Sequence, residues 1–328
     1  MMLNNSIQSV FICIVLALYA GCASPAQKEE IKKSFVRRGD ALYAEGKYAE
    51  AFDYYEEGIP FIPYTAAASA AGSYLANKRV RVSTFGEEGD TDDAVPKISI
   101  DSTGEECFYR AMDCQVKLGN YNYVLSQYEK YIGYFPNYSR MEDVVDTIKF
   151  LIAKYEEWGK KSAAVRGYKL LLRIDPFSLD GRNAYFAIAD YYFGGGNYLE
   201  AIEYYKDIKL YFPADKRIPE VLFKMGIASF RQFKGIFYDL TCIENSKRYL
   251  HAYLKTEDRV YAERCRKYLT VINEIEAERM YYKGTFFLRK KEYIAAKMYF
   301  KKIKEEYKGT PWAVKAVRKL MKMKAVER

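Results

Sequence analysis

The chain contains 328 residues, carries a formal net charge of +9, and has an aromatic content of 16%. This length fits either two globular domains or one array of repeats. The single histidine and the lack of metal-ligand spacing argue against a zinc centre, and we expect neither a metal nor another cofactor. No paired acid and base and no activated nucleophile is evident, so we expect the protein not to be an enzyme.

An uncharged apolar run, Val10 to Ala20, lies near the start of the chain and is too short to span a bilayer comfortably. The motif that ends it, Tyr19 to Cys22, resembles a bacterial lipobox, where a signal peptidase cuts before a cysteine that carries diacylglycerol. We therefore predict a lipoprotein signal peptide at residues 1–21, lipid attachment at Cys22 and a lipidated tether at residues 22–33. The alternative is an ordinary signal peptide, with Cys22 merely early in the mature chain.

A lipoprotein signal also constrains location and partners. We expect a protein held at the periplasmic face of the outer membrane by its N-terminal lipid. Nucleic acid is not an expected partner of an exported chain, despite the positive charge.

Five later segments share one layout, in which two apolar stripes with helical spacing flank a turn and a proline follows. In the clearest segment, residues 181–213, three consecutive glycines separate the predicted helices and Pro213 ends the second one. Four of the second helices carry a small residue followed one turn later by an aromatic residue. These pairs are Ala51 and Tyr55, Ala164 and Tyr168, Ala201 and Tyr205, and Ala296 and Phe300. The pattern is typical of tetratricopeptide repeats and predicts an all-α, tetratricopeptide-type α-solenoid of about five to six helix-turn-helix repeats.

The repeats suggest a division of the mature chain. Residues 34–213 hold the N-terminal and central repeats, interrupted at 80–103 by an insertion without helical periodicity, which we expect to form a long loop or a short hairpin. Residues 214–328 hold further repeats and a basic terminal helix. Within them, residues 258–288 show no breaker and predict one long helix or two abutting ones.

The remaining cysteines give no clear disulfide framework. Cys107 and Cys114 are too far apart on one predicted helix to pair. Cys242 and Cys265 lie in adjacent predicted helices and could meet, but buried free thiols are the favoured interpretation.

The first helices of such repeats line a concave face that suits extended peptides. Residues predicted to face this groove are Val36, Asp40, Tyr43, Tyr109, Asp113, Phe186 and Asp190. For each of them alone, packing or ordinary solvation is the alternative.

The C-terminal part of the chain contains a spaced set of aromatic and small residues with one glutamate and one threonine: Glu278, Tyr281, Tyr282, Tyr293, Ala295, Ala296, Tyr307, Thr310 and Ala316. In these residues it resembles the BamD family of outer-membrane assembly lipoproteins. This resemblance implies an accessory lipoprotein of the β-barrel assembly machinery. Its partners would be a BamA-like barrel assembly protein, other assembly lipoproteins and unfolded outer-membrane proteins.

Basic residues gather late in the chain, where a solvated face, an acidic partner domain or anionic lipid would account for them. The candidates for a partner interface are Arg289, Lys290, Lys291, Lys301 and Lys302. Two other functions stay open: an adaptor lipoprotein of another periplasmic pathway, such as a solute-receptor partner or a Tol-Pal or cell-division factor, and an enzyme acting on peptidoglycan.

Overall fold

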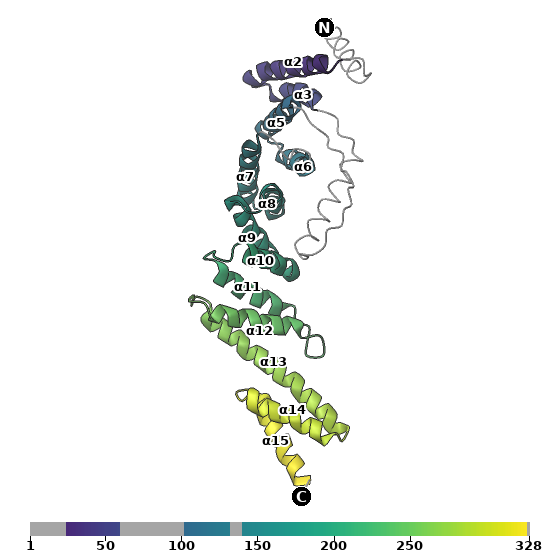
Figure 1. The fold of residues 1–328 in the computed structure, drawn as a ribbon, viewed down its shortest axis with the longest axis vertical. Helices are drawn as coiled ribbons and strands as arrows, with labels where there is room; N and C mark the ends of the chain where they lie inside the picture. The colour runs from purple at the N-terminus through teal and green to yellow at the C-terminus, as the bar shows by residue number, and fades with distance from the viewer. Residues whose placement is uncertain (1–23, 60–101, 132–139, 327–328) are drawn as a thin grey trace. The chain divides into compact units, whose positions relative to one another are not determined.

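The computed structural model describes residues 24–59, 102–131 and 140–326, and every regular element in these ranges is a helix. The predicted all-α class is therefore confirmed (Figure 1). The signal peptide, Cys22 and nearly all of the insertion at 80–103 lie outside the described residues. The chain divides into two compact units, Met1–Ile174 and Asp175–Arg328, each of which is described by itself below.

The first unit contains three helix pairs. They are α2 (Pro25–Ala44) with α3 (Tyr48–Gly58), α5 (Ser102–Lys117) with α6 (Tyr121–Tyr131), and α7 (Met141–Glu157) with α8 (Lys161–Ile174). Consecutive pairs also touch, because α5 packs on both helices of the first pair. This is the repeat-on-repeat packing of a tetratricopeptide array.

The second unit contains three more pairs and a last helix. The pairs are α9 (Leu179–Gly194) with α10 (Tyr198–Tyr211), α11 (Ile218–Arg231) with α12 (Thr241–Leu254), and α13 (Ala262–Arg289) with α14 (Tyr293–Glu306). Helix α15 (Pro311–Val326) packs on α13 and α14. The described residues thus hold six helix pairs, in agreement with the predicted five to six repeats.

Five of the turns within pairs have one geometry, the Schellman motif. In this motif two backbone N–H groups that follow the helix donate hydrogen bonds to carbonyls of its last turn. In the first pair, Gly46 N–H donates to the Tyr43 carbonyl and Lys47 N–H donates to the Leu42 carbonyl. The motif needs a left-handed residue at its centre. That residue is Gly46, Gly119, Gly159 or Gly196 in four pairs, with φ between 67° and 79°, and Lys291 in the fifth.

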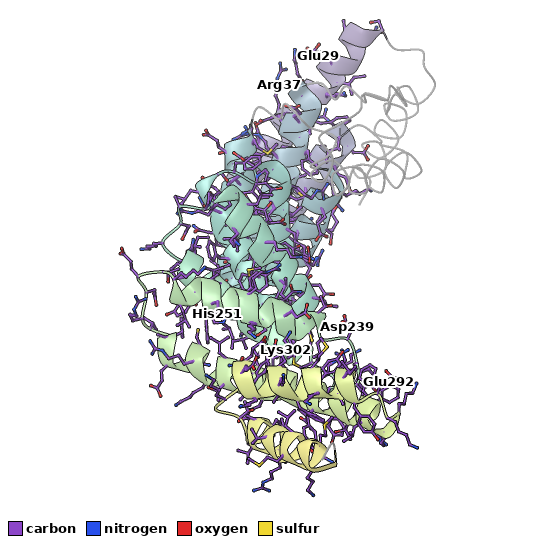
Figure 2. The ribbon with its side chains drawn as sticks, turned by 60° about the horizontal axis from the view of Figure 1, so that its bottom comes forward. Glu29, Arg37, Asp239, His251, Glu292 and Lys302 are labelled. Carbon is purple, nitrogen blue, oxygen red and sulfur yellow. The ribbon has the colours of Figure 1, made fainter. Side chains whose placement is uncertain are left out.

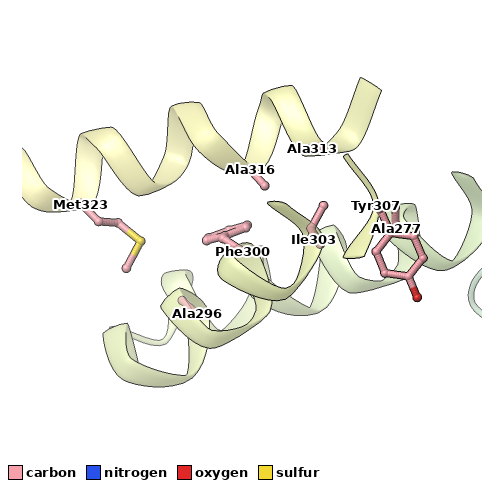
Figure 3. Close-up of a cluster of buried hydrophobic side chains, with 8 residues drawn as sticks. All are labelled: Ala277, Ala296, Phe300, Ile303, Tyr307, Ala313, Ala316 and Met323. Atoms are coloured by element: carbon pink, nitrogen blue, oxygen red, sulfur yellow. The ribbon is translucent and has the colours of Figure 1, made fainter. Parts of the chain in front are cut away.

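The predicted small and aromatic residues of the second helices form much of the core. Ala51, Tyr55, Ala201, Tyr205, Ala296 and Phe300 are all fully buried. Two of these rings pack against a glycine of the first helix: a Cβ on Gly39 would lie 2.5 Å from the Tyr55 ring, and one on Gly284 would lie 2.9 Å from Phe300. Figure 3 shows Phe300 between its own helix and α15, where it meets Ala316 in a cluster that also includes Met323.

The pair α7–α8 departs from this rule. Its first helix presents Ile152 and its second helix presents Gly167, whose Cβ would lie 2.6 Å from Ile152. In this pair the large side chain therefore lies on the first helix and the glycine lies on the second, the reverse of the arrangement in the pairs α2–α3 and α13–α14. As a result the predicted knob Tyr168 is only half-buried and donates its hydroxyl to Glu156 at 2.8 Å.

Three further expectations can be compared with the structure. From Pro25 onward the segment expected as a tether, residues 22–33, belongs to helix α2, because Ser24 and Gln27 form a capping box and Pro25 favours the first helical turn. Its role as a tether stays a prediction. Residues 258–288 do contain one long helix, α13. Cys107, Cys114, Cys242 and Cys265 are all free, so Cys242 and Cys265 do not pair and the free-thiol interpretation is confirmed.

Candidate interaction surfaces

The groove candidates of the first unit are bonded to neighbouring helices. Asp40 accepts a hydrogen bond from the Tyr55 hydroxyl at 2.6 Å and pairs with Arg110 at 3.0 Å. Tyr43 donates its hydroxyl to Asp113. Because Arg110 and Asp113 belong to α5, these contacts join the first repeat to the second.

The central repeat has the same arrangement. Asp190 accepts from the Tyr205 hydroxyl at 2.6 Å and pairs with Lys224 of the next repeat at 2.8 Å. Burial raises the pKa of Tyr205, and the hydrogen bond to Asp190 raises it further. We call this set of a first-helix aspartate, a second-helix tyrosine and a cation from the next repeat the clasp.

Aromatic groove candidates are covered by arginines. The Arg140 guanidinium lies 3.8 Å from the centre of the Tyr109 ring, and Arg217 lies 3.5 Å from that of Phe186. Val36 is half-buried. Tyr109 and Phe186 therefore contact the following repeat in the described structure. The role of all these residues in binding a peptide stays a prediction.

The basic interface candidates are placed differently, on the outer surface of α13 and α14. Arg289, Lys290, Lys291, Lys301 and Lys302 are all exposed, and Figure 2 labels Lys302 on α14. Between them α14 exposes two apolar side chains, Ile294 at 81% and Met298 at 67%. We call these seven residues the α13–α14 surface.

Lys291 gives this surface an unusual backbone. It has φ of 61° at the turn position that glycine holds in four other pairs. The left-handed conformation costs a residue with a Cβ about 1–2 kcal/mol. Strain of this kind collects at functional positions, so a lysine kept here marks the turn as a candidate interaction site.

The net positive charge of the protein is concentrated around this surface. Residues 283–328 contain 15 Lys and Arg against 4 Asp and Glu, a net charge of +11, whereas the whole chain carries +9. The other residues together are therefore slightly acidic. A segment with so strong an excess of one charge favours association with groups of the opposite charge.

No catalytic constellation accompanies these surfaces in the described residues. His251 is exposed on α12 (Figure 2), and no group of three His, Cys, Asp or Glu side chains is placed to hold a metal in the part of the chain that is described. Burial raises the pKa of the Cys114 thiol to about 12 and that of Cys265 to about 11, so both stay protonated and unreactive at neutral pH. Within the described ranges, no helix combines the length and the apolar character that crossing a bilayer requires.

The chain matches no protein-family model and no curated relative. Among solved structures it is similar to a tetratricopeptide repeat protein from Parabacteroides merdae, with 12% identity, a TM-score of 0.28, and coverage of 89% of this chain and 98% of the other. It is also similar to the C-terminal part of a repeat-containing protein of the same type from Cytophaga hutchinsonii, with 14% identity, a TM-score of 0.29, and coverage of 86% and 98%. The tetratricopeptide-type fold of this chain rests on its own helix pairs, Schellman turns and buried knobs.

Proposed function

We propose that this protein is a non-catalytic scaffold lipoprotein of the outer-membrane β-barrel assembly machinery. In this proposal the α13–α14 surface binds a BamA-type barrel protein. The first helices of the repeats accept unfolded outer-membrane proteins, and the lipid on Cys22 anchors the chain at the periplasmic face of the outer membrane.

The observation that carries the proposal is the composition of the α13–α14 surface. Apolar Ile294 and Met298 lie among exposed cations. Within the described ranges, Arg289, Lys290, Lys291 and Lys301 form no ion pair. Lys302 lies 3.9 Å from Glu306, at the limit of an ion pair. An apolar centre with a charged rim is the usual anatomy of a protein interface, and the sign of the rim calls for an acidic partner.

The assignment to the β-barrel assembly machinery is supported by the resemblance to the assembly lipoproteins, because several of the matching residues form the core of this last repeat. Tyr307, Thr310 and Ala316, which belong to the matching set, are buried where α14 meets α15. The Tyr307 hydroxyl donates to Glu276 at 3.1 Å, and Lys247 pairs with the same carboxylate at 2.6 Å. These residues build the support for the surface, while the exposed residues select the partner.

Affinity purification from membranes in mild detergent tests the proposal. The tagged full-length protein should recover a barrel assembly protein, and the triple variant Lys290→Glu, Lys291→Glu and Lys301→Glu should lose most of it. Exposed Lys216 and Lys255 supply the control, because their reversal to glutamate changes charge in the same direction away from the surface. Recovery of a solute-binding protein or a division factor instead would overturn the assembly role and favour an adaptor of another pathway.

A further inference from the structure

A second site, separate from the α13–α14 surface, lies on the pair α9–α10. On α10, Tyr204, Asp207 and Tyr211 are spaced by three and four residues, so they share one face of the helix. Tyr185 of α9 faces them, with ring centres 6.4 Å from Tyr204 and 5.9 Å from Tyr211. The carboxylate of Asp207 is thus flanked along its helix by two tyrosine rings that both contact a third.

This carboxylate lacks the kinds of partner that Asp40 and Asp190 have. Within the described residues the side chain of Asp207 forms no hydrogen bond and no ion pair, whereas Asp40 and Asp190 are each bonded to a tyrosine and a cation. The adjacent residue Lys206, whose charge lowers the pKa of Asp207, is itself paired with Glu203 at 2.7 Å. The side chain of Asp207 is half-buried, so it remains reachable from solvent.

The electrostatic state of Asp207 reflects this isolation. Burial among the rings raises its pKa to about 6, the nearby charge of Glu203 acts in the same direction, and Lys206 opposes both. The carboxylate in turn raises the pKa of Tyr185 and of Tyr211, where burial is the larger cause. A half-buried carboxylate without a counter-charge is costly to keep ionised.

We propose that Tyr185, Tyr204, Tyr211 and Asp207 form an aromatic cage that binds an organic cation, the ammonium or guanidinium group of a side chain or of a small amine. Aromatic faces attract such cations through the negative charge above the ring. The carboxylate supplies the opposite charge, and the bound cation compensates its lost hydration. A metal ion is a poor match, because the cage offers one carboxylate and no cluster of further oxygen ligands.

Saturation-transfer NMR on the full-length protein in dodecyl maltoside tests this site with three probes. Choline carries a quaternary ammonium, 3,3-dimethyl-1-butanol is its neutral isostere, and acetyl-Gly-Lys-Gly-amide carries a lysine side chain. Choline or the lysine peptide should bind at pH 7.5, and the neutral isostere should not. Asp207→Asn should weaken cation binding at least tenfold, while Glu200→Gln, an exposed control on the same helix, should not change it.

The same titrations show whether the bound cation belongs to a partner's side chain or to a small amine, and they can also contradict the proposal. Tighter binding of the peptide assigns the cage to a partner's side chain, and tighter binding of choline assigns it to a small amine. Binding should weaken between pH 7.5 and pH 5 in the wild type as Asp207 takes up a proton, and stay flat in Asp207→Asn. Equal binding of the neutral isostere, or binding unchanged in Asp207→Asn, would overturn the proposal, and so would the absence of signal from both cations. A thermal unfolding curve confirms that each variant is folded.

Discussion

Replacing Lys291 by glycine tests whether the α13–α14 turn is strained for the sake of a surface charge. Lys291 has φ of 61°, and relief of the left-handed strain is worth about 1–2 kcal/mol. Lys291 lies just past the end of α13, so loss of its charge costs about 0.3 kcal/mol, and the greater freedom of glycine in the unfolded chain costs about 0.5 kcal/mol. We expect a net stabilisation of about 0.5–1 kcal/mol.

The assay must report on this repeat, since arrays of repeats do not unfold in one step. Native-state hydrogen exchange of the amides in α13 and α14 is such a readout. The expected gain corresponds to a roughly two- to fivefold lower opening equilibrium in this repeat. Binding to the partner should fall in the same variant, because the charge is lost.

The reverse substitution Gly196→Lys provides the matched control. Gly196 has φ of 79° at the equivalent turn position, and a Cβ there would meet nothing within 4 Å. Its replacement should therefore destabilise α9–α10 through backbone strain without a clash, by about 1 kcal/mol. The strain argument is wrong if both variants fail. That is the case if hydrogen exchange in α13 and α14 is unchanged or faster in Lys291→Gly, and hydrogen exchange in α9 and α10 is unchanged in Gly196→Lys.

Three further outcomes follow from the packing and the charges. Tyr205→Phe removes the hydroxyl that bonds to Asp190 at 2.6 Å and should cost about 1 kcal/mol in denaturant unfolding; no loss would show that the clasp is not stabilising. Gly39→Ala places a Cβ 2.5 Å from the Tyr55 ring and should destabilise by about 1–3 kcal/mol, with faster exchange in α2 and α3 as the readout. Asp207 has a pKa of about 6, above its ordinary 3.8, so the folded state binds the extra proton and its stability should fall as pH rises from about 4 to 6. Asp207→Asn should remove that slope and, after allowance for partial exposure, stabilise the protein at pH 7.5 by about 1–2 kcal/mol in thermal unfolding; a wild-type profile without the slope would contradict the argument.

Much of the fold could be predicted because helix pairs leave local signals. Ala201 and Tyr205 show the face that each second helix buries, and Gly196 shows where the chain reverses. The start of α2 also has a local signal, since Ser24 and Gln27 have the spacing of a capping box. The reversed positions of the large residue Ile152 and the small residue Gly167 could not be predicted from the sequence, because they depend on how two helices pack against each other.

The candidate sites were harder to predict than the fold. Asp40 and Asp190 are predicted to face a groove, and the structure adds that each is bonded to a tyrosine and to a cation of the following repeat. Those cations are far away in sequence, so no local pattern links them to the aspartates. The sequence marks Lys291 only by its charge. Its left-handed backbone conformation becomes evident when the five equivalent turns are compared in the structure. No sequence pattern distinguishes Asp207, because its lack of a bonding partner depends on how the helices pack.

Site-specific photo-crosslinking in intact cells tests the central claim most directly. A photoreactive residue at Ile294, which is 81% exposed, should crosslink to a barrel assembly protein of the outer membrane, and the same probe at Leu199 of α10, which is 65% exposed, should not. Loss of the Ile294 crosslink on adding Lys290→Glu and Lys301→Glu would tie it to the basic rim. Equal crosslinking from both positions, or a single partner from another periplasmic pathway at Ile294, would contradict the account.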